Sequence, residues 1–366
     1  MRICAVIASL GCGGAERVLL ELCRAWMERG DNVILVTLSH GAEDHYPVPA
    51  GVTRVPLDVL GHTRGWQVVS ANVTRVRALR RAIVQASPDV VVSFIDRMNV
   101  RTLLATSGLP MPVIVSERSD PREYPMGTLW SALRTLTYRH ADALVMQTSS
   151  LRAWGETHLP SSCVLVIPNP VRMASNAEID LPVHARGTEI VAMGRMADAK
   201  GFDLLIDAFA MVQPEFPAWR LRIVGDGPDR ATLERQARSR LPESAVIFHG
   251  RTADPDSILA ATPVFVLSSR YEGFPNVLLE ALQSGCACVA TDCQSGPADL
   301  ITHGTNGLLV APRSAPAIAE GLRTLLRDEA MRDAFGASAS ASVSRFALSG
   351  IVTQWDEAFR AAGAHP

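Results

Sequence analysis

The sequence is short of lysine, of net charge and of long apolar runs. Lys200 is the single lysine among 35 basic residues, and the formal net charge is −2. A nearly neutral chain gives no electrostatic case for a nucleic-acid partner, which would need a basic surface. No apolar run approaches the roughly 18 residues of a membrane span, and the first apolar segment lacks a signal-peptide cleavage site. We therefore expect a soluble, cytoplasmic protein that is at most peripheral at a membrane.

The seven cysteines are an odd number and show no C-x-x-C spacing. Several of them fall in apolar segments, so the pattern predicts buried, reduced thiols rather than a disulfide framework. Cys12 differs because it lies in a glycine-rich loop. A nucleophilic role would need a basic partner, and the sequence identifies none for it.

The length of 366 residues exceeds one core of usual size, and the hydrophobic content of 48% is ample for two. Apolar strand patterns alternate with helical patterns, which is typical of α/β domains with a parallel sheet between helices. We expect a first domain over residues 1–170, a linker rich in Pro, Ser and Asn over 171–188, and a second domain over 189–348. A last helix is expected over 349–366, after a low-complexity break at 337–344 in the helical tail.

The first strand (residues 2–9) leads into the glycine loop 10–14 and a helix over 15–29. This order is typical of loops that hold a phosphate, and it also suggests a dinucleotide-binding fold. A dinucleotide site would place an acid at the end of the second strand. That strand ends in Ser39 and His40 instead, which argues against a nicotinamide-dependent dehydrogenase.

The segment 269–285 combines a loop acid with the start of a short helix. Glu272 precedes a helical pattern over 276–284, which Gly285 ends. Backbone N–H groups around such a helix start, in the stretch Phe274, Pro275, Asn276 and Val277, form a site for a phosphate oxygen, although the proline itself has no N–H. Glu280 lies about one turn into the helix and can accept hydrogen bonds from hydroxyl groups. A single ligand with a phosphate and a sugar satisfies the whole segment, whereas the simpler interpretation is two solvated acids.

The second domain opens with a strand over 190–193 and the loop Gly194–Gly201. Arg195 and Lys200 lie five positions apart in that loop and can both point at one diphosphate. The alternative is a pair of exposed cations beside the next helix, over 202–212. A lone lysine in an arginine-rich chain favours a role that a compact ammonium fills and a guanidinium does not.

Two further segments keep two interpretations open. Glu117, Arg118 and Asp120 follow a strand over 112–116, so they form either a satisfied loop network or part of an acceptor site. The basic helix over 72–86 is either an ordinary solvated helix or a surface for anionic lipid headgroups or an acceptor diphosphate. Asp254 and Asp256 offer a D-x-D pattern, but an acid before a helix is more often an N-cap, so we predict no metal there.

Several of these segments together resemble one enzyme family. The segments are G-G-A-E-R-V (13–18), S-E-R-S-D-P-R (116–122), G-R-M-A-D-A-K-G (194–201), E-G-F-P-N-V-L-L-E-A (272–281) and S-G-P-A-D-L-I (295–301). In this combination they resemble the retaining, GT-B-fold glycosyltransferases of family 4. The resemblance covers nearly the whole chain.

The resemblance implies a fold and a set of roles. Two Rossmann-like domains would face each other across a cleft, and the last helix would return to the first domain, with Trp355 and Phe359 as its anchors. Arg195 and Lys200 would hold the leaving diphosphate, Glu272 the hydroxyls of the donor sugar and Glu280 those of the ribose. Further donor contacts would come from Gly13 and Gly14 at the diphosphate, and from Arg251 and Thr252 near the base.

The implied reaction is transfer of a hexose or hexosamine from a nucleoside-diphosphate donor, UDP being common, without a metal or other cofactor. Acceptors in the most similar group are glycans and polyprenyl-diphosphate-linked sugars of bacterial cell surfaces, with peripheral contact at the inner membrane face. Many members carry a histidine near the sugar where this chain has Arg118. Two alternatives stay open: a sugar-nucleotide epimerase of the same fold, and a non-catalytic sugar-nucleotide sensor.

Overall fold

The computed structural model describes residues 1–42, 44–61, 67–160, 163–171 and 183–364. The chain forms two compact units, Met1–Pro170 with Leu348–Pro366, and Val171–Ala347. Each unit contains one parallel sheet with helices on both faces, which confirms the predicted α/β class. Most of the linker that the sequence predicts at 171–188 lies outside the described residues.

The first unit is built on a parallel sheet of seven strands in the order β3-β2-β1-β4-β5-β6-β7. The strands are β1 (Arg2–Ile7), β2 (Asn32–Thr37), β3 (Thr53–Pro56), β4 (Val90–Phe94), β5 (Val113–Ser116), β6 (Ala143–Met146) and β7 (Val164–Val166). Strands β1, β4, β5 and β6 are apolar runs with almost every residue buried, as expected of strands covered on both faces. The order reverses between β1 and β4, which is where Rossmann-like sheets bind ligands.

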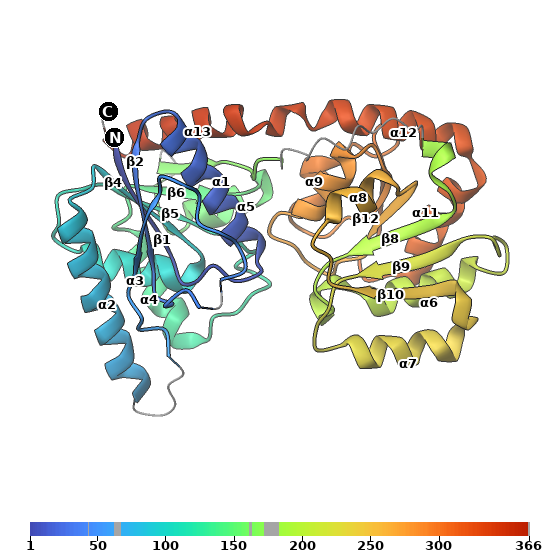
Figure 1. Ribbon diagram of the computed structural model, residues 1–366, viewed down its shortest axis with the longest axis horizontal. Helices are drawn as coiled ribbons and strands as arrows, with labels where there is room; N and C mark the ends of the chain where they lie inside the picture. The colour runs from blue at the N-terminus through green and yellow to red at the C-terminus, as the bar shows by residue number, and fades with distance from the viewer. Residues whose placement is uncertain (43, 62–66, 161–162, 172–182, 365–366) are drawn as a thin grey trace. The chain divides into compact units, whose positions relative to one another are not determined.

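Helices cover both faces of this sheet (Figure 1). They are α1 (Gly14–Glu28), α2 (Gln67–Ala86), α3 (Asp96–Thr106), α4 (Thr128–Tyr138), α5 (Ser149–Glu156) and α13 (Leu348–Ala361). Helices α1 and α13 share one hydrophobic core with the sheet, and α2 to α5 share the other. Strand β7 and helix α5 complete the far edge.

The basic helix α2 proves to be partly structural. Arg75 is buried, and its guanidinium donates hydrogen bonds to three carbonyl oxygens over residues 59–61. Arg80 donates to two carbonyl oxygens at the end of α3. Arg77 and Arg81 remain exposed. Two of these four arginines therefore attach the helix to the rest of the unit.

The last helix, α13, packs on the first unit through aromatic side chains (Figure 1). Trp355 and Phe359 are both buried, and their ring centroids lie 6.0 and 5.5 Å from that of Trp26 on α1. Trp355 also stacks on Phe94 at the end of β4, with 5.8 Å between centroids. These contacts confirm that the two residues anchor the helix.

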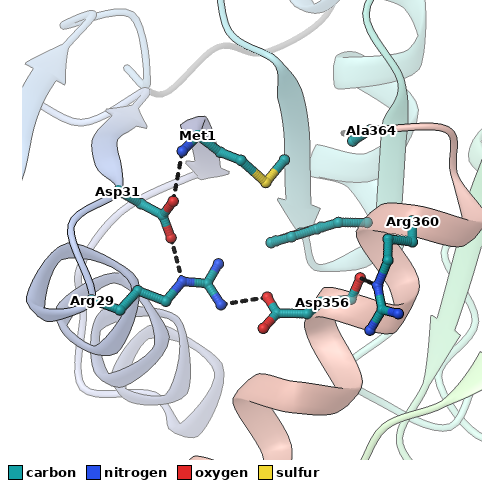
Figure 2. Close-up of a pocket in the computed structure, with 7 residues that line it drawn as sticks. Met1, Arg29, Asp31, Asp356, Arg360 and Ala364 are labelled. Atoms are coloured by element: carbon teal, nitrogen blue, oxygen red, sulfur yellow. Dashed lines mark hydrogen bonds and ion pairs between the residues drawn. The ribbon is translucent and has the colours of Figure 1, made fainter. Parts of the chain in front are cut away.

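Charged groups add to this contact. Figure 2 shows Arg29, at the end of α1, between Asp31 and Asp356, with ion pairs to both. The amino group of Met1 lies 2.7 Å from Asp31. Helix α13 is thus held by an apolar face and by a chain of ion pairs at its edge.

The second unit contains a parallel sheet of six strands in the order β10-β9-β8-β11-β12-β13. The strands are β8 (Glu189–Met193), β9 (Arg220–Val224), β10 (Val246–Gly250), β11 (Val264–Leu267), β12 (Ala287–Thr291) and β13 (Leu308–Val310). Here the order reverses between β8 and β11, so the loops after these two strands emerge side by side.

The helices of the second unit also form two layers (Figure 1). They are α6 (Phe202–Val212), α7 (Arg230–Arg240), α8 (Pro255–Ala260), α9 (Asn276–Gln283), α10 (Pro297–Leu300), α11 (Ala315–Arg327) and α12 (Glu329–Ser342), with 3₁₀ turns at Val183–Arg186, Asp198–Lys200, Glu243–Ala245 and Ser344–Phe346. Helices α6, α7 and α11 pack on one face of the sheet, while α9 and part of α12 pack on the other.

The predicted break in the helical tail is wrong. The break lies earlier, since α11 ends at Arg327 and α12 starts at Glu329. The side chain of Asp328 caps α12 by accepting a hydrogen bond from the N–H of Met331 at 2.8 Å. The low-complexity stretch is largely helical, to residue 342. Alanine favours helix, and Gly336 packs so closely on Gly285 that a Cβ would lie 2.5 Å from its carbonyl oxygen.

Candidate functional site

The predicted donor residues of the second unit lie on loops at the carboxyl ends of its strands. Arg195 and Lys200 follow β8, and Glu272 follows the neighbouring strand β11. Parallel strands present these ends at the same edge of the sheet, where open α/β folds bind ligands. The strand order therefore brings together residues that lie far apart in the sequence.

Lys200 and Glu272 form a direct ion pair. The Nζ atom of Lys200 lies 2.6 Å from Oε1 of Glu272, although the residues are 72 positions apart. The side chains are 24% and 9% exposed, so the pair is shielded but still reachable from solvent. Lysine has three N–H donors, and Glu272 takes one of them.

A buried hydroxyl group holds Glu272 in place. Ser269 donates a hydrogen bond of 2.6 Å to the same Oε1 atom, and its carbonyl oxygen accepts one of 2.6 Å from the hydroxyl of Thr291. Ser269 and Thr291 are both buried. The other oxygen of Glu272, Oε2, makes no hydrogen bond to any residue that the structure describes.

The two residues flanking Ser269 fix the backbone of the Lys200 loop. The hydroxyl of Ser268 donates to the carbonyl oxygen of Lys200 at 2.8 Å, and the N–H of Arg270 donates to that of Ala199, also at 2.8 Å. The guanidinium of Arg270 donates to the carbonyl oxygen of Asp198 and forms an ion pair with Asp203 on α6.

Gly201 closes the same loop in the left-handed region, at φ 60°. A Cβ there would lie 2.2 Å from the carbonyl oxygen of Ser268, so only glycine fits. The segment Ser268–Arg270 and Gly201 together define the position of Lys200.

Arg195 stands apart from this network. It is exposed, and it makes no hydrogen bond or ion pair within the described part of the chain. Its neighbour Met196 is buried and exchanges backbone hydrogen bonds with the loop after β9, at Asp226 and Asp229. The backbone that carries Arg195 is therefore fixed, while its guanidinium faces solvent.

Helix α9 begins as predicted beside Glu272. Phe274 and Pro275 are buried before its first turn, and Glu280 is 6% exposed within it. The loop after β12 supports this start, because the hydroxyl of Ser295 donates to the carbonyl oxygen of Gly273 at 3.0 Å. Asn276 and Val277 are half-buried in the first turn.

The loop after β10 contains Arg251, which is exposed, and Thr252, whose hydroxyl accepts a hydrogen bond from the N–H of Asp254. Asp254 caps α8 by accepting from the N–H of Ser257 at 3.1 Å, which confirms the predicted cap. Over the described ranges, no three His, Cys, Asp or Glu side chains gather in a way that could hold a metal ion.

The cysteines near these loops are buried and unbridged. Cys293 is buried, and burial together with the Glu272 carboxylate raises the pKa of its thiol to about 12. Cys4, Cys23, Cys286 and Cys288 are also buried and unbridged, as predicted, while Cys12 is exposed.

In the first unit, Glu117 and Asp120 each have a charged or polar partner within the chain. Glu117 is buried after β5 and accepts a hydrogen bond of 2.6 Å from Tyr138, with Arg134 at 3.7 Å. Burial outweighs these partners and raises the pKa of Glu117 to about 7. Asp120 is buried and accepts two-pronged hydrogen bonds from Arg122.

Arg118 is different from its neighbours. Its Cζ atom lies 3.8 Å from the ring centroid of Phe94, and it makes no ion pair with any described residue. Arg118 therefore lies outside the contacts of Glu117 and Asp120, with which the sequence had grouped it.

Gly13 and Gly14 lie at the start of α1, where the N–H of Gly13 donates to the carbonyl oxygen of Gly11.

Sequence models of two glycosyltransferase domains match the chain. Glycosyltransferase Family 4 matches residues 12–174, and Glycosyl transferases group 1 matches residues 180–341. The chain belongs to the GT-B glycosyltransferases of family 4. The match confirms the family that the motifs indicated.

Similar proteins agree with this assignment. The glycosyltransferase is 28% identical, over 97% of both chains, to GalNAc-alpha-(1->4)-GalNAc-alpha-(1->3)-diNAcBac-PP-undecaprenol alpha-1,4-N-acetyl-D-galactosaminyltransferase of Campylobacter jejuni. Its fold is similar to sucrose-phosphate synthase from Thermosynechococcus elongatus, with a TM-score of 0.82, 18% identity and 98% of both chains covered. It is also similar to Anabaena HepE, solved with UDP and glucose, with a TM-score of 0.79, 22% identity and coverage of 98% and 99%.

The sequence motifs of this glycosyltransferase missed the residues that hold the site. Ser269 and Arg270 lie in the segment 269–285, but the sequence assigns them no role; Ser268 precedes that segment, and Thr291 ends the next strand. Their role depends on β8, β11 and β12 being neighbours, which is a property of strand order. Two surface cavities, beside Met1 and α13 and beside β13 and α11, include none of the residues predicted to bind donor or acceptor. In the described segments no helix has the length and apolarity to cross a membrane.

Proposed function

We propose that this glycosyltransferase transfers a hexose or N-acetylhexosamine from a UDP-sugar to a glycan or polyprenyl-diphosphate-linked sugar, with retention of configuration and without a metal. The observation that carries the proposal is the Lys200 and Glu272 pair at 2.6 Å, beside the start of α9. A cation and a helix start suit a diphosphate, and a carboxylate suits sugar hydroxyls. One sugar nucleotide would meet all three.

The difficult step is separation of an anionic diphosphate from an oxocarbenium-like sugar. Negative charge grows on the leaving phosphate. Lys200 is the cation of this pair, and Arg195 lies five residues before it in the same loop. Opposite charges 4 Å apart attract by about 4 kcal/mol at an effective dielectric of 20. Because Ser268 and Arg270 already hold the loop of Lys200, the ammonium needs little reorganisation when the charge develops.

Glu272 acts in this proposal as a hydrogen-bond acceptor and not as a nucleophile. Its Oε1 atom already accepts hydrogen bonds from Lys200 and Ser269, which withdraw electron density from the carboxylate. Its Oε2 atom remains for a hydroxyl of the donor sugar. The leaving phosphate would take the proton of the acceptor.

The remaining predicted residues complete the donor site. Glu280 would bind the ribose hydroxyls, and the backbone N–H groups of Phe274 and Val277 would bind phosphate oxygens. Arg251 and Thr252 would lie near the base. Gly13 and Gly14 are the diphosphate-binding residues that the sequence predicts in the first unit.

The acceptor class is supported by the Campylobacter jejuni relative, whose name describes an undecaprenyl diphosphate-linked acceptor. An acceptor with a lipid tail would bring the enzyme to a membrane surface, where the exposed Arg77 and Arg81 of α2 would meet anionic headgroups. Contact with the inner membrane face would therefore be peripheral.

The test has two steps. A thermal-shift panel of UDP-, GDP- and ADP-sugars identifies the donor, and that donor is then incubated with a polyprenyl-diphosphate-linked sugar in the presence of EDTA. The proposal predicts stabilisation by a UDP-sugar, transfer that survives EDTA, and an α-linked product by NMR when the donor is α-linked. An inverted product or loss of transfer in EDTA would contradict it. If the protein instead epimerises the sugar nucleotide without any acceptor, it is an epimerase and not a transferase.

A further inference from the structure

Arg118 is a cation without a counter-charge. Two of its guanidinium nitrogens, Nε and Nη2, are buried and donate no hydrogen bond. The side chain stacks on the buried ring of Phe94, with Cζ 3.8 Å from the centroid, and no carboxylate in the described ranges lies within ion-pair distance. Burial lowers the pKa of Arg118 to about 9, so the group is still charged at neutral pH.

The carboxylates nearest in sequence are already in use. Glu117 accepts a hydrogen bond from Tyr138 and lies 3.7 Å from Arg134. Asp120 accepts hydrogen bonds from Arg122, through both Nε and Nη2 and from its backbone N–H. The chain therefore supplies Arg122 with a partner and leaves Arg118 without one.

More unsatisfied polar atoms occur at the same edge of the sheet. Buried atoms without a hydrogen-bond partner are Oδ1 of Asn99, Oγ of Ser116, Oε2 of Glu117, Nε of Arg134 and Oε1 of Gln147. Ser116 and Glu117 lie at the carboxyl end of β5 and Gln147 directly follows β6, whereas Asn99 lies on α3 and Arg134 on α4. Since buried polar groups are nearly always paired, the three at the strand ends favour a polar occupant there.

The backbone beside Arg118 is strained. Ile95, directly after the stacking residue Phe94, has φ at 76°, which is rare for a β-branched side chain. Its carbonyl oxygen accepts the first hydrogen bonds of α3, so the strain is held by the fold. Strain of this kind is concentrated at ligand sites, and β4 borders the point where the strand order reverses.

We propose that Arg118 binds a phosphate group of the acceptor. A planar guanidinium matches the geometry of phosphate oxygens, and stacking on Phe94 orients it in advance. The donor and the acceptor both contain phosphate. The second unit already has Arg195 and Lys200 for the donor diphosphate, so the cation of the first unit is left for a second phosphate. This inference rests on the proposed function, because it assumes an acceptor linked through a diphosphate.

The experiment compares the wild-type protein with Arg118→Gln, Arg118→Lys and the control Arg122→Gln. Arg122 is a cation of the same loop whose charge Asp120 already neutralises. Calorimetry with farnesyl diphosphate probes the acceptor phosphate, and calorimetry with UDP probes the donor phosphate. Circular dichroism shows whether each variant is folded, and Arg118→Lys retains a charge at the position in case Arg118→Gln does not fold.

We expect Arg118→Gln to weaken farnesyl diphosphate binding by at least tenfold and to leave UDP binding unchanged. Arg118→Lys should weaken the same binding by a smaller factor, because it keeps the charge but loses the planar fork, and Arg122→Gln should change neither ligand. Equal farnesyl diphosphate binding by all four proteins, or none by the wild type, would overturn the inference. Weaker UDP binding alone would also overturn it, since Arg118 would then serve the donor.

These measurements separate the inference from the proposed function. Binding of farnesyl diphosphate is read without turnover, so it remains informative if no donor is active. If the wild type transfers sugar and the Arg118 variants keep its acceptor KM, the inference alone fails. If the wild type binds farnesyl diphosphate through Arg118 but transfers nothing, the proposed function alone fails.

Discussion

At the scale of single residues, Lys200 tests whether a compact ammonium is required. Lys200→Arg keeps the charge, but it puts a planar guanidinium where a compact ammonium lies 2.6 Å from Glu272. We expect kcat to fall by about 10- to 100-fold, with an unfolding free energy close to that of the wild type. Steady-state kinetics and urea titration measure both. Full activity in this variant would mean that the single lysine of the chain has no special role.

Substitution of Ser269 tests whether its hydroxyl holds Glu272 in the position needed for activity. Ser269→Ala removes the hydrogen bond to Glu272, so the carboxylate and Lys200 should lose their fixed positions. The expected loss is about tenfold or more in kcat, together with about 1–3 kcal/mol of stability because the hydroxyl is buried. Ser269→Thr keeps a hydroxyl and should recover most of the activity. If both variants lost stability but kept the wild-type kcat, Ser269 would have only a structural role.

The raised pKa of Glu117 predicts that the stability of the protein depends on pH. Burial raises its pKa from 4.5 to about 7, so the folded protein binds more protons than the unfolded chain between these values. Stability should therefore fall as pH rises from about 5 to 7, and Glu117→Gln, which cannot ionise, should remove this part of the slope. Urea unfolding at pH 5, 6 and 7.5 measures it. Parallel pH profiles for the two proteins would contradict a raised pKa.

At the scale of elements, α13 should stabilise the first unit strongly. Trp355 is buried between Trp26 and Phe94, so Trp355→Ala should cost about 3–5 kcal/mol of unfolding free energy. Asp356→Ala removes an exposed ion pair with Arg29 and should cost less than about 1 kcal/mol. Chemical denaturation compares the two variants. Similar losses for both would mean that charge, and not aromatic packing, holds the helix.

The elements that the sequence predicted well are those with a strong apolar pattern. Strand β8 and helix α6 match their predicted spans to within a residue, because their buried positions are apolar. Strand β3 was not predicted, since it is a short, half-exposed edge strand that ends in Pro56. The tail was divided wrongly because composition suggested a loop where Gly336 packs against Gly285.

At the scale of the whole molecule, the motifs identified the family and named Lys200 and Glu272. They could not show that the two residues form an ion pair, because that contact depends on β8 and β11 being neighbours. Nor could they show that Glu117 and Asp120 are neutralised while Arg118 is not, since Tyr138, Arg134 and Phe94 reach these residues only in the folded unit. Side-chain roles that depend on strand order and burial could therefore not be predicted from the sequence.

The account depends most on cations of the second unit binding the donor diphosphate. Calorimetry with UDP, followed by steady-state turnover, tests this in the wild type, Lys200→Ala, Arg195→Ala and the control Arg238→Ala, whose exposed side chain lies on α7. We predict UDP binding by the wild type and the control, at least tenfold weaker binding by the other two, and about 10²–10³-fold lower kcat in Lys200→Ala. Wild-type affinity and turnover in both Lys200→Ala and Arg195→Ala would contradict the account.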